Sequence, residues 1–205
     1  MANGKSQIQE KKAALTRREI LEACRRLFAS RGYVGTTMAD IAAEAGLSVQ
    51  TIYNYIGGKA ALLEALLDLV DEIAQVQDTQ RRIAESEDPV EILTLTAQLR
   101  RRLMEGAGDI VSVVGVASKS EPDLHRAWAD AQRRSYRGIE RIAARLDDLQ
   151  ALRENLDRER ARDVIYAILH PSIYERLVDE CGWTPDEAER WFARSLYELV
   201  LENGE

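Results

Sequence analysis

The chain has 205 residues, of which 45% are hydrophobic and 31% charged, so it can bury a sizeable core in one large domain or two small ones. The sequence shows neither a signal peptide nor a run of about 18 apolar residues, so we expect no membrane span and a cytoplasmic location. Cys24 and Cys181 lack the spacing of a disulfide framework or a metal site. We therefore expect two buried, reduced thiols, no metal and no cofactor.

Charge is distributed unevenly along the chain. The net charge is −7, yet residues 1–60 contain nine Lys or Arg against five Asp or Glu, a local charge of +4. Residues 61–205 therefore carry −11. Such an asymmetry is compatible with a basic segment that contacts nucleic acid, followed by an acidic body.

Helix is expected almost everywhere, because the chain has four prolines and no alternating run of β-branched residues. Thr16 begins the first predicted helix, which Gly32 ends. Thr37 caps a short helix that stops at Gly46, and Ser48 caps the next. A long amphipathic helix runs from Lys59 to about residue 77. Five further helices are predicted at residues 89–105, 109–120, 122–147, 157–181 and 185–202.

The two short helices, from Thr37 to Ala45 and from Ser48 to Ile56, have the spacing of a helix-turn-helix. A generic helical hairpin has the same spacing. The second helix, SVQTIYNYI, is rich in amide, hydroxyl and aromatic side chains, which can bond base edges and phosphates. This composition favours a role in DNA recognition.

The run GYVGTTMADIAAEAGLSVQTIYNYIGGKAALLEAL resembles the signature of the TetR family of bacterial transcription regulators, a similarity that extends over about residues 16–67. The resemblance implies an all-α fold, with a three-helix DNA-binding domain at 14–74 and a helical effector-binding and dimerisation domain at 75–205. The sequence differs from many members of the family at Val49, where lysine is common. It also differs at Gly57 and Gly58, where serine or asparagine often caps the next helix.

The resemblance also implies residue roles. Phosphate contacts are expected from Thr37, Tyr53, Tyr55 and Lys59. Contacts nearest the bases are expected from Val49, Gln50, Thr51 and Asn54. Thr36 and Ser48 complete the predicted DNA-binding set.

Some of these residues have plainer interpretations. Tyr53 and Tyr55 are alternatively core residues, although residues two apart face different sides of a helix, so at least one should be exposed. Arg25, Arg26 and Arg31 are candidates for DNA contact or for a solvated face.

A small-molecule effector is expected in the second domain, where polar aromatic residues are candidate pocket residues: His125, Trp128, Tyr136, Tyr166 and His170. Each of them is alternatively an ordinary packing residue. The last two predicted helices carry apolar stripes and resemble the paired helices through which TetR relatives form homodimers. The alternative is that they close the core of the monomer.

The sequence therefore predicts a homodimeric regulator that binds double-stranded operator DNA, with repression relieved by an unidentified effector. No nucleophile or cofactor motif is found, so no catalytic residue is expected. The remaining alternatives are a helical adaptor that binds protein and, less favoured than the adaptor, an enzyme.

Overall fold

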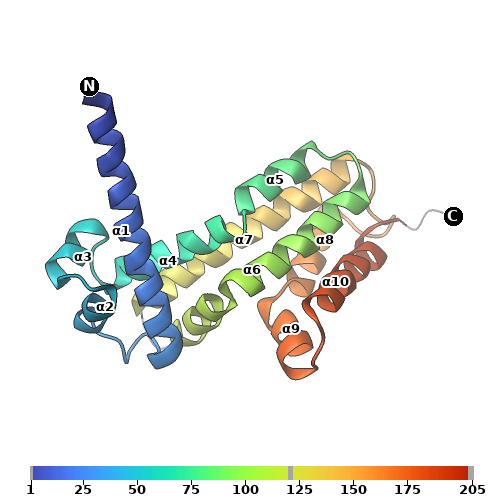
Figure 1. Ribbon diagram of the computed structural model, residues 1–205. Coiled ribbons are helices and arrows are strands. Elements are labelled where there is room, and N and C mark those ends of the chain that lie inside the picture. Colours follow the sequence, from blue (N-terminus) through green and yellow to red (C-terminus); the bar gives the residue numbers. More distant parts are fainter. Residues whose placement is uncertain (1, 120–121, 203–205) are drawn as a thin grey trace. The chain divides into compact units, whose positions relative to one another are not determined.

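The computed structural model describes residues 2–119 and 122–202, and these residues are predominantly helical (Figure 1). The only β-structure in these ranges is an isolated bridge between Leu152 and Leu201. The all-α fold class is therefore confirmed. The helices are α1 (Ala2–Arg31), α2 (Met38–Ala45), α3 (Val49–Tyr55), α4 (Lys59–Ile73), α5 (Val76–Glu85), α6 (Pro89–Ala117), α7 (Pro122–Asp148), α8 (Arg158–Ile168), α9 (Pro171–Glu175) and α10 (Pro185–Val200), with a π-helical turn, η1 (Arg176–Glu180), after α9.

The chain divides into two compact units, each built from two segments. Unit 1 contains the residues up to Leu69 together with Asp109–Ala129, and unit 2 contains Val70–Gly108 together with the residues from Asp130 onward. Helices α4, α6 and α7 contribute residues to both units. The sequence predicted two continuous domains, 14–74 and 75–205, because a pattern read along the chain does not show that residues 109–129 return to the first unit.

Unit 1 is built around α1, against which α2 and α3 pack (Figure 1). Its core consists of apolar side chains from these three helices and α4, including Ile20, Leu27, Phe28, Ile41, Ile52, Leu62 and Leu66. The prediction that α1 begins at Thr16 was wrong, since the helix already begins at Ala2. The added segment is rich in Lys, Gln and Ala, which favour helix, and contains no proline to stop it.

The long helix predicted from Lys59 to about residue 77 is interrupted. Helix α4 ends at Ile73, and Gln75 adopts a left-handed conformation with φ of 55° before α5 begins. Helix α5 was missed entirely, because its polar sequence, VQDTQRRIAE, gave only a narrow apolar stripe through the buried Thr79 and Ile83.

The predicted interruption between residues 105 and 109 is a kink inside one helix. Ala107, with φ of −153° and ψ of 17°, leaves the helical conformation within α6. A Cβ on the neighbouring Gly106 would lie 2.5 Å from Cγ2 of Ile73, so glycine permits α6 to approach the end of α4 closely.

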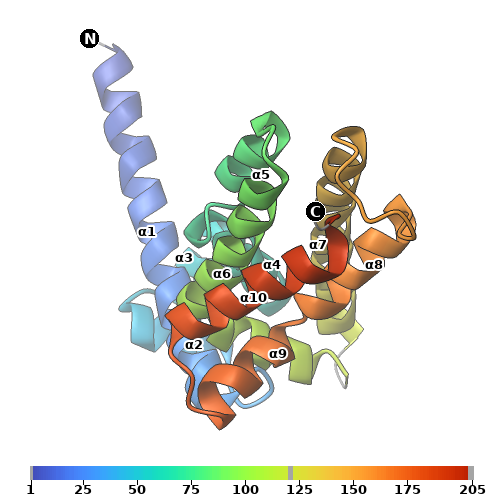
Figure 2. The ribbon, with the colours of Figure 1, turned by 90° about the vertical axis from the view of Figure 1, so that its right-hand side faces the viewer.

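Unit 2 has its own apolar core, to which α5, α6, α7, α8, α9 and α10 contribute, and α8 and α10 pack against each other (Figure 2). The prediction of one helix over 157–181 was wrong. Helix α8 ends at Ile168 and α9 starts at Pro171, because proline lacks the N–H needed to continue a helix.

The two cysteines differ in exposure. Cys24 is buried, as expected, and burial raises the pKa of its thiol to about 12. Cys181 is exposed, which corrects the expectation of a buried thiol, because it follows η1 at the end of that turn. Among the helices described, none is long and apolar enough to cross a membrane.

Candidate nucleic-acid interface

The turn before α2 is held by two neighbouring threonines with different roles. Thr36 is buried, and its hydroxyl donates to the carbonyl oxygens of Gly32, at 2.9 Å, and Leu27, at 3.3 Å. Thr37 is exposed and caps α2: its Oγ1 accepts from the backbone N–H of Asp40. The structure thus uses Thr36 inside the fold, whereas Thr37 remains at the surface.

The Thr37 cap also fixes the charge of Asp40. The Asp40 carboxylate accepts from the Thr37 hydroxyl at 2.6 Å and from its backbone N–H at 2.9 Å, which lowers the pKa of Asp40. Arg31 lies 3.5 Å away and adds to this effect. Helix α2 therefore begins at a rigid capping box, which positions the turn into α3.

Helix α3 begins in the same manner. Gly46, in the left-handed conformation with φ of 66°, ends α2, and Ser48 then caps α3 by accepting from the N–H of Thr51 at 3.1 Å. The hydroxyls of Ser48 and Thr51 lie 2.7 Å apart. Two short helices joined through a glycine turn constitute a helix-turn-helix.

The outer side of α3 exposes groups that a structural helix would bury. Ile52 is 0% exposed and anchors the helix, whereas Val49, Tyr53 and Tyr55 are 36%, 51% and 42% exposed. Gln50 and Asn54 are also exposed, and the Gln50 amide donates to Asn54 Oδ1 at 3.0 Å. We call the five exposed residues the α3 surface: Val49, Gln50, Tyr53, Asn54 and Tyr55.

Lys59 opens α4 close to the turn that precedes α2. Its Nζ lies 4.1 Å from the centroid of the Tyr33 ring, a cation–π contact. Tyr33 itself is buried against Phe28, with ring centroids 5.3 Å apart. The ammonium is thereby held on the rigid core of unit 1 instead of on a freely moving side chain.

The three arginines considered for DNA contact each have an acidic partner. Arg25 binds Asp109 through Nε and Nη2, at 2.8 and 2.6 Å, and Arg26 Nε lies 2.9 Å from Glu44. Arg31 pairs with Asp40. These pairs favour a role for the three side chains within the fold over contact with a phosphate.

The predicted effector residues are only partly brought together. Tyr136 and Tyr166, both in unit 2, form an edge-to-face pair with centroids 5.3 Å apart. His170 is exposed and caps α9, its Nδ1 accepting from the N–H of Ser172. In unit 1, His125 is exposed, and the half-buried Trp128 ring would meet a Cβ on Gly115 at 3.5 Å. Of the five, only the two tyrosines contact each other directly.

One residue of interest was missed at the sequence level. Arg100 is the first of three consecutive arginines in α6, and its Nε is shielded from solvent without a hydrogen-bond partner. A run of three arginines reads as a solvated charged face, so the sequence carries no signal that one of them is buried.

The fold and the exposed α3 surface define the class of protein: an all-helical protein with an N-terminal helix-turn-helix. Residues 20–66 match the family model described as bacterial regulatory proteins of the TetR family. The regulator TtgR of Pseudomonas putida is 38% identical over 102 residues, 50% of this chain and 46% of that protein. The N-terminal segment of the chain is thus similar to TetR-family regulators, and the chain spans about half the length of the curated relatives it matches.

Solved structures extend the likeness in fold to nearly the whole chain. A transcriptional regulator of Saccharomonospora viridis in complex with choline superposes with a TM-score of 0.74 at 22% identity, covering 93% of this chain and 100% of that one. The regulator FadR of Bacillus subtilis in complex with stearoyl-CoA gives 0.71 at 19% identity, covering 87% and 96%. The C-terminal helices thus share their fold with these two proteins.

Proposed function

We propose that the protein is a DNA-binding transcription regulator that acts as a cytoplasmic homodimer and is controlled by a small-molecule effector. The observation that carries the proposal is the α3 surface. On a seven-residue helix, two tyrosines and a valine face solvent while Ile52 holds the helix in the core. Exposed apolar and aromatic side chains beside amides indicate an interaction surface. Amides and hydroxyls can bond the base edges of DNA and its sugar-phosphate backbone.

The groups divide by chemistry. Gln50 and Asn54 are amides, which bond base edges, and Val49 is suited to a thymine methyl group. Tyr53, Tyr55 and Lys59 offer hydroxyls and an ammonium for phosphates. Thr37 is omitted from this group because its hydroxyl already donates to the Asp40 carboxylate. Ser48 and Thr51 start α3, so their hydroxyls lie at the end of the helix whose N-terminal residues enter the major groove. Thr36 is omitted from the proposal because its hydroxyl is used within the turn.

Dimerisation is proposed through α8 and α10. The stripe Ala188, Phe192, Leu196 and Val200 is buried in unit 2 and closes its own core. A second set remains partly accessible: Leu199 is 43% exposed, and Val164, Ile168 and Trp191 are half-buried. A homodimer that covers this second set would present two α3 helices, about 34–36 Å apart, to a palindromic site.

The effector is proposed to bind in the C-terminal part and to favour a conformation unsuited to DNA, so that the protein represses until the effector arrives. The choline and stearoyl-CoA complexes show that proteins of this fold hold small molecules of very different chemistry. The curated relatives that match about half of this chain are named as transcriptional regulators, which supports regulation over catalysis.

The test is selection of DNA from a pool of random duplexes by the purified full-length protein. We expect a palindromic consensus, bound at least about 10³-fold more tightly than random duplex and with an affinity that falls steeply with salt. The Val49→Ala variant should select an altered consensus, whereas Val116→Ala, which trims a valine that is also exposed in unit 1, should not. Enrichment of no sequence by the wild type would overturn the proposal and favour a protein-binding adaptor.

A further inference from the structure

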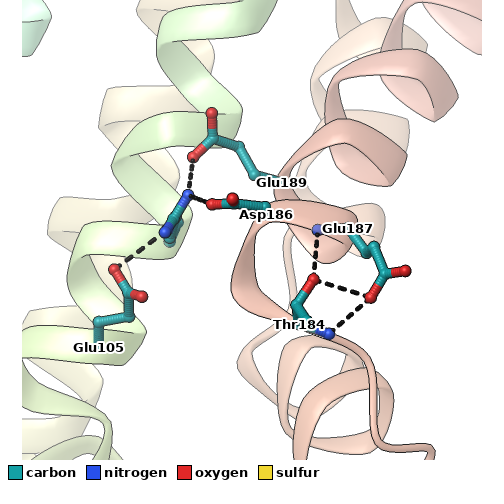
Figure 3. A network of polar contacts seen from close by, with 6 residues as sticks. Glu105, Thr184, Asp186, Glu187 and Glu189 are labelled. Atoms are coloured by element: carbon teal, nitrogen blue, oxygen red, sulfur yellow. Dashed lines mark hydrogen bonds and ion pairs between the residues drawn. The ribbon is translucent and has the colours of Figure 1, made fainter.

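Three consecutive arginines in α6 are partnered very differently. Arg101 is bound by three carboxylates: Glu105 at 3.1 Å, Asp186 at 2.5 Å and Glu189 at 3.1 Å (Figure 3). Arg102 donates to the carbonyl of Ala74 at 3.1 Å and to the hydroxyl of Thr79 at 2.6 Å. Arg100 has no hydrogen bond or ion pair within residues 2–119 and 122–202, and its Nε is shielded from solvent.

The pKa values of Arg100 and Arg101 shift in opposite directions for the same reason. Hydrogen bonds that Arg101 donates to Glu105 and Glu189 raise its pKa, whereas burial lowers the pKa of Arg100 to about 10. A buried guanidinium without a counter-charge is costly, because desolvation is not offset by attraction to an anion. No hydrogen bond or ion pair from the described residues offsets this cost at Arg100, so a bound anion would stabilise its charged form.

Two tyrosines of unit 2 are relevant to Arg100. Tyr166 of α8 is the group whose electrostatic interaction with Arg100 opposes the fall in pKa. Tyr166 packs against the core of unit 2 and against the edge of Tyr136. The hydroxyl of Tyr174, on α9, is buried in the same core and also has no hydrogen-bond partner.

The unused groups define the chemistry of a ligand. Among the described residues, these are the only two buried side-chain polar atoms without a partner, and both can donate a hydrogen bond. The fork of a guanidinium matches the two oxygens of a carboxylate, and the apolar core suits a hydrocarbon or aromatic body. A cationic ligand would add a second unpaired positive charge, so it is disfavoured.

We propose that unit 2 binds an amphipathic organic carboxylate, with Arg100 holding its acidic head and the core around Tyr166 and Tyr174 holding its apolar body. This inference rests on the proposed function and names the chemical class of its effector. It assigns a binding role to Arg100 that Arg101 and Arg102 do not share, because both are already bound by groups of the chain itself.

The experiment measures thermal unfolding of the full-length protein with straight-chain carboxylates from butanoate to dodecanoate. Alkylammonium ions of the same lengths are the matched controls. At least one carboxylate should raise the Tm by several degrees at about 100 times its Kd, and no ammonium ion should match it. Arg100→Met should weaken that carboxylate at least about tenfold, and Arg190→Met, an exposed arginine of α10, should leave it unchanged.

The Tm of the Arg100→Met variant without ligand shows whether the substitution simply unfolds the protein. Without ligand, Arg100→Met should keep or raise the Tm, since it removes an uncompensated charge. A marked fall in Tm, or dissociation of a dimer, would overturn the proposal by showing that the protein itself or a second copy supplies the partner. Equal shifts with carboxylates and ammonium ions, no shift with any carboxylate, or equal response of Arg100→Met and wild type would overturn it as well.

The same carboxylate should lower the affinity for the selected duplex about 5-fold to 150-fold in the wild type and not in Arg100→Met. The two proposals fail separately. Selective DNA binding without any response to carboxylates would remove the anion site and leave the regulator. If the protein binds a carboxylate through Arg100 but selects no DNA sequence, the anion site stands and the proposed regulatory function is overturned.

Discussion

The α3 surface and the core of unit 2 both hold side chains with unused bonding capacity, but at very different cost. Tyr53 and Tyr55 face water, which satisfies their hydroxyls at little expense. Arg100 Nε is sealed from water, so its missing partner is costly. An exposed polar group therefore indicates a binding function only when the side chains around it have a matching chemistry. A polar atom that is shielded from water and has no partner indicates one by itself. The mutations below test this contrast.

The largest effect on stability is expected within α3, where the buried Ile52 lies between exposed residues. Ile52→Ala should lower the free energy of unfolding by about 2–5 kcal/mol, because the isoleucine is fully buried and its removal leaves a cavity. Val49→Ala, three residues earlier on the exposed side, should change it by less than about 0.5 kcal/mol. Urea unfolding of both full-length variants measures the difference. Similar losses would mean that α3 is not docked through Ile52.

A smaller effect is expected at Arg101. Arg101→Met leaves Glu105, Asp186 and Glu189 without their shared cation and should destabilise the protein by about 1 kcal/mol, since these groups are partly exposed. The same substitution at Arg100 should not destabilise it. Thermal unfolding at low and at 0.5 M salt provides the check, because only the loss at Arg101 should shrink with salt. The reverse order would contradict the assignment of partners.

Lys59 tests how much of the proposed interface is purely electrostatic. Lys59→Ala should weaken all duplexes by a similar factor and reduce the slope of log affinity against log salt by about 1. Lys119→Ala, an exposed lysine at the end of α6, is the matched control and should leave the slope unchanged. A change in the preferred sequence on Lys59→Ala would instead place this ammonium against a base.

The smallest effect concerns the cap of α2. The pKa of Asp40 is lowered in the folded state by the Thr37 hydroxyl, so this carboxylate contributes stability above its ordinary pKa of about 3.9 and loses it as pH falls. Thr37→Val removes the hydroxyl. The gap in Tm between wild type and Thr37→Val should therefore narrow from pH 7 to pH 3. A constant gap would show that the hydroxyl does not act through the charge of Asp40.

Local signals in the sequence predicted unit 1 well. The caps at Thr37 and Ser48 and the glycine stop at Gly46 all lie where the sequence pattern predicted them. These features depend on residues three or four apart, which the sequence presents directly. The approach of the threonine turn to α1, which buries Thr36, depends on tertiary packing and was not foreseen.

Unit 2 was predicted less completely for the same reason. The break at Gln75 comes from a left-handed residue that is not glycine, and the polar helix α5 is held through Thr79 and Ile83 against neighbours distant in sequence. The shielding of Arg100 Nε depends on the tertiary packing of unit 2. No periodicity in the RRR run distinguishes its three members, so only the folded structure separates them.

The central claim is that the α3 surface reads DNA, and Tyr53 tests it most directly. The affinity of wild type, Tyr53→Ala and Tyr53→Phe for the selected duplex should be measured together with their Tm. We predict a loss of at least about tenfold for Tyr53→Ala, a smaller loss for Tyr53→Phe, and little change in Tm, since Tyr53 is 51% exposed. Wild-type affinity in Tyr53→Ala would contradict the claim.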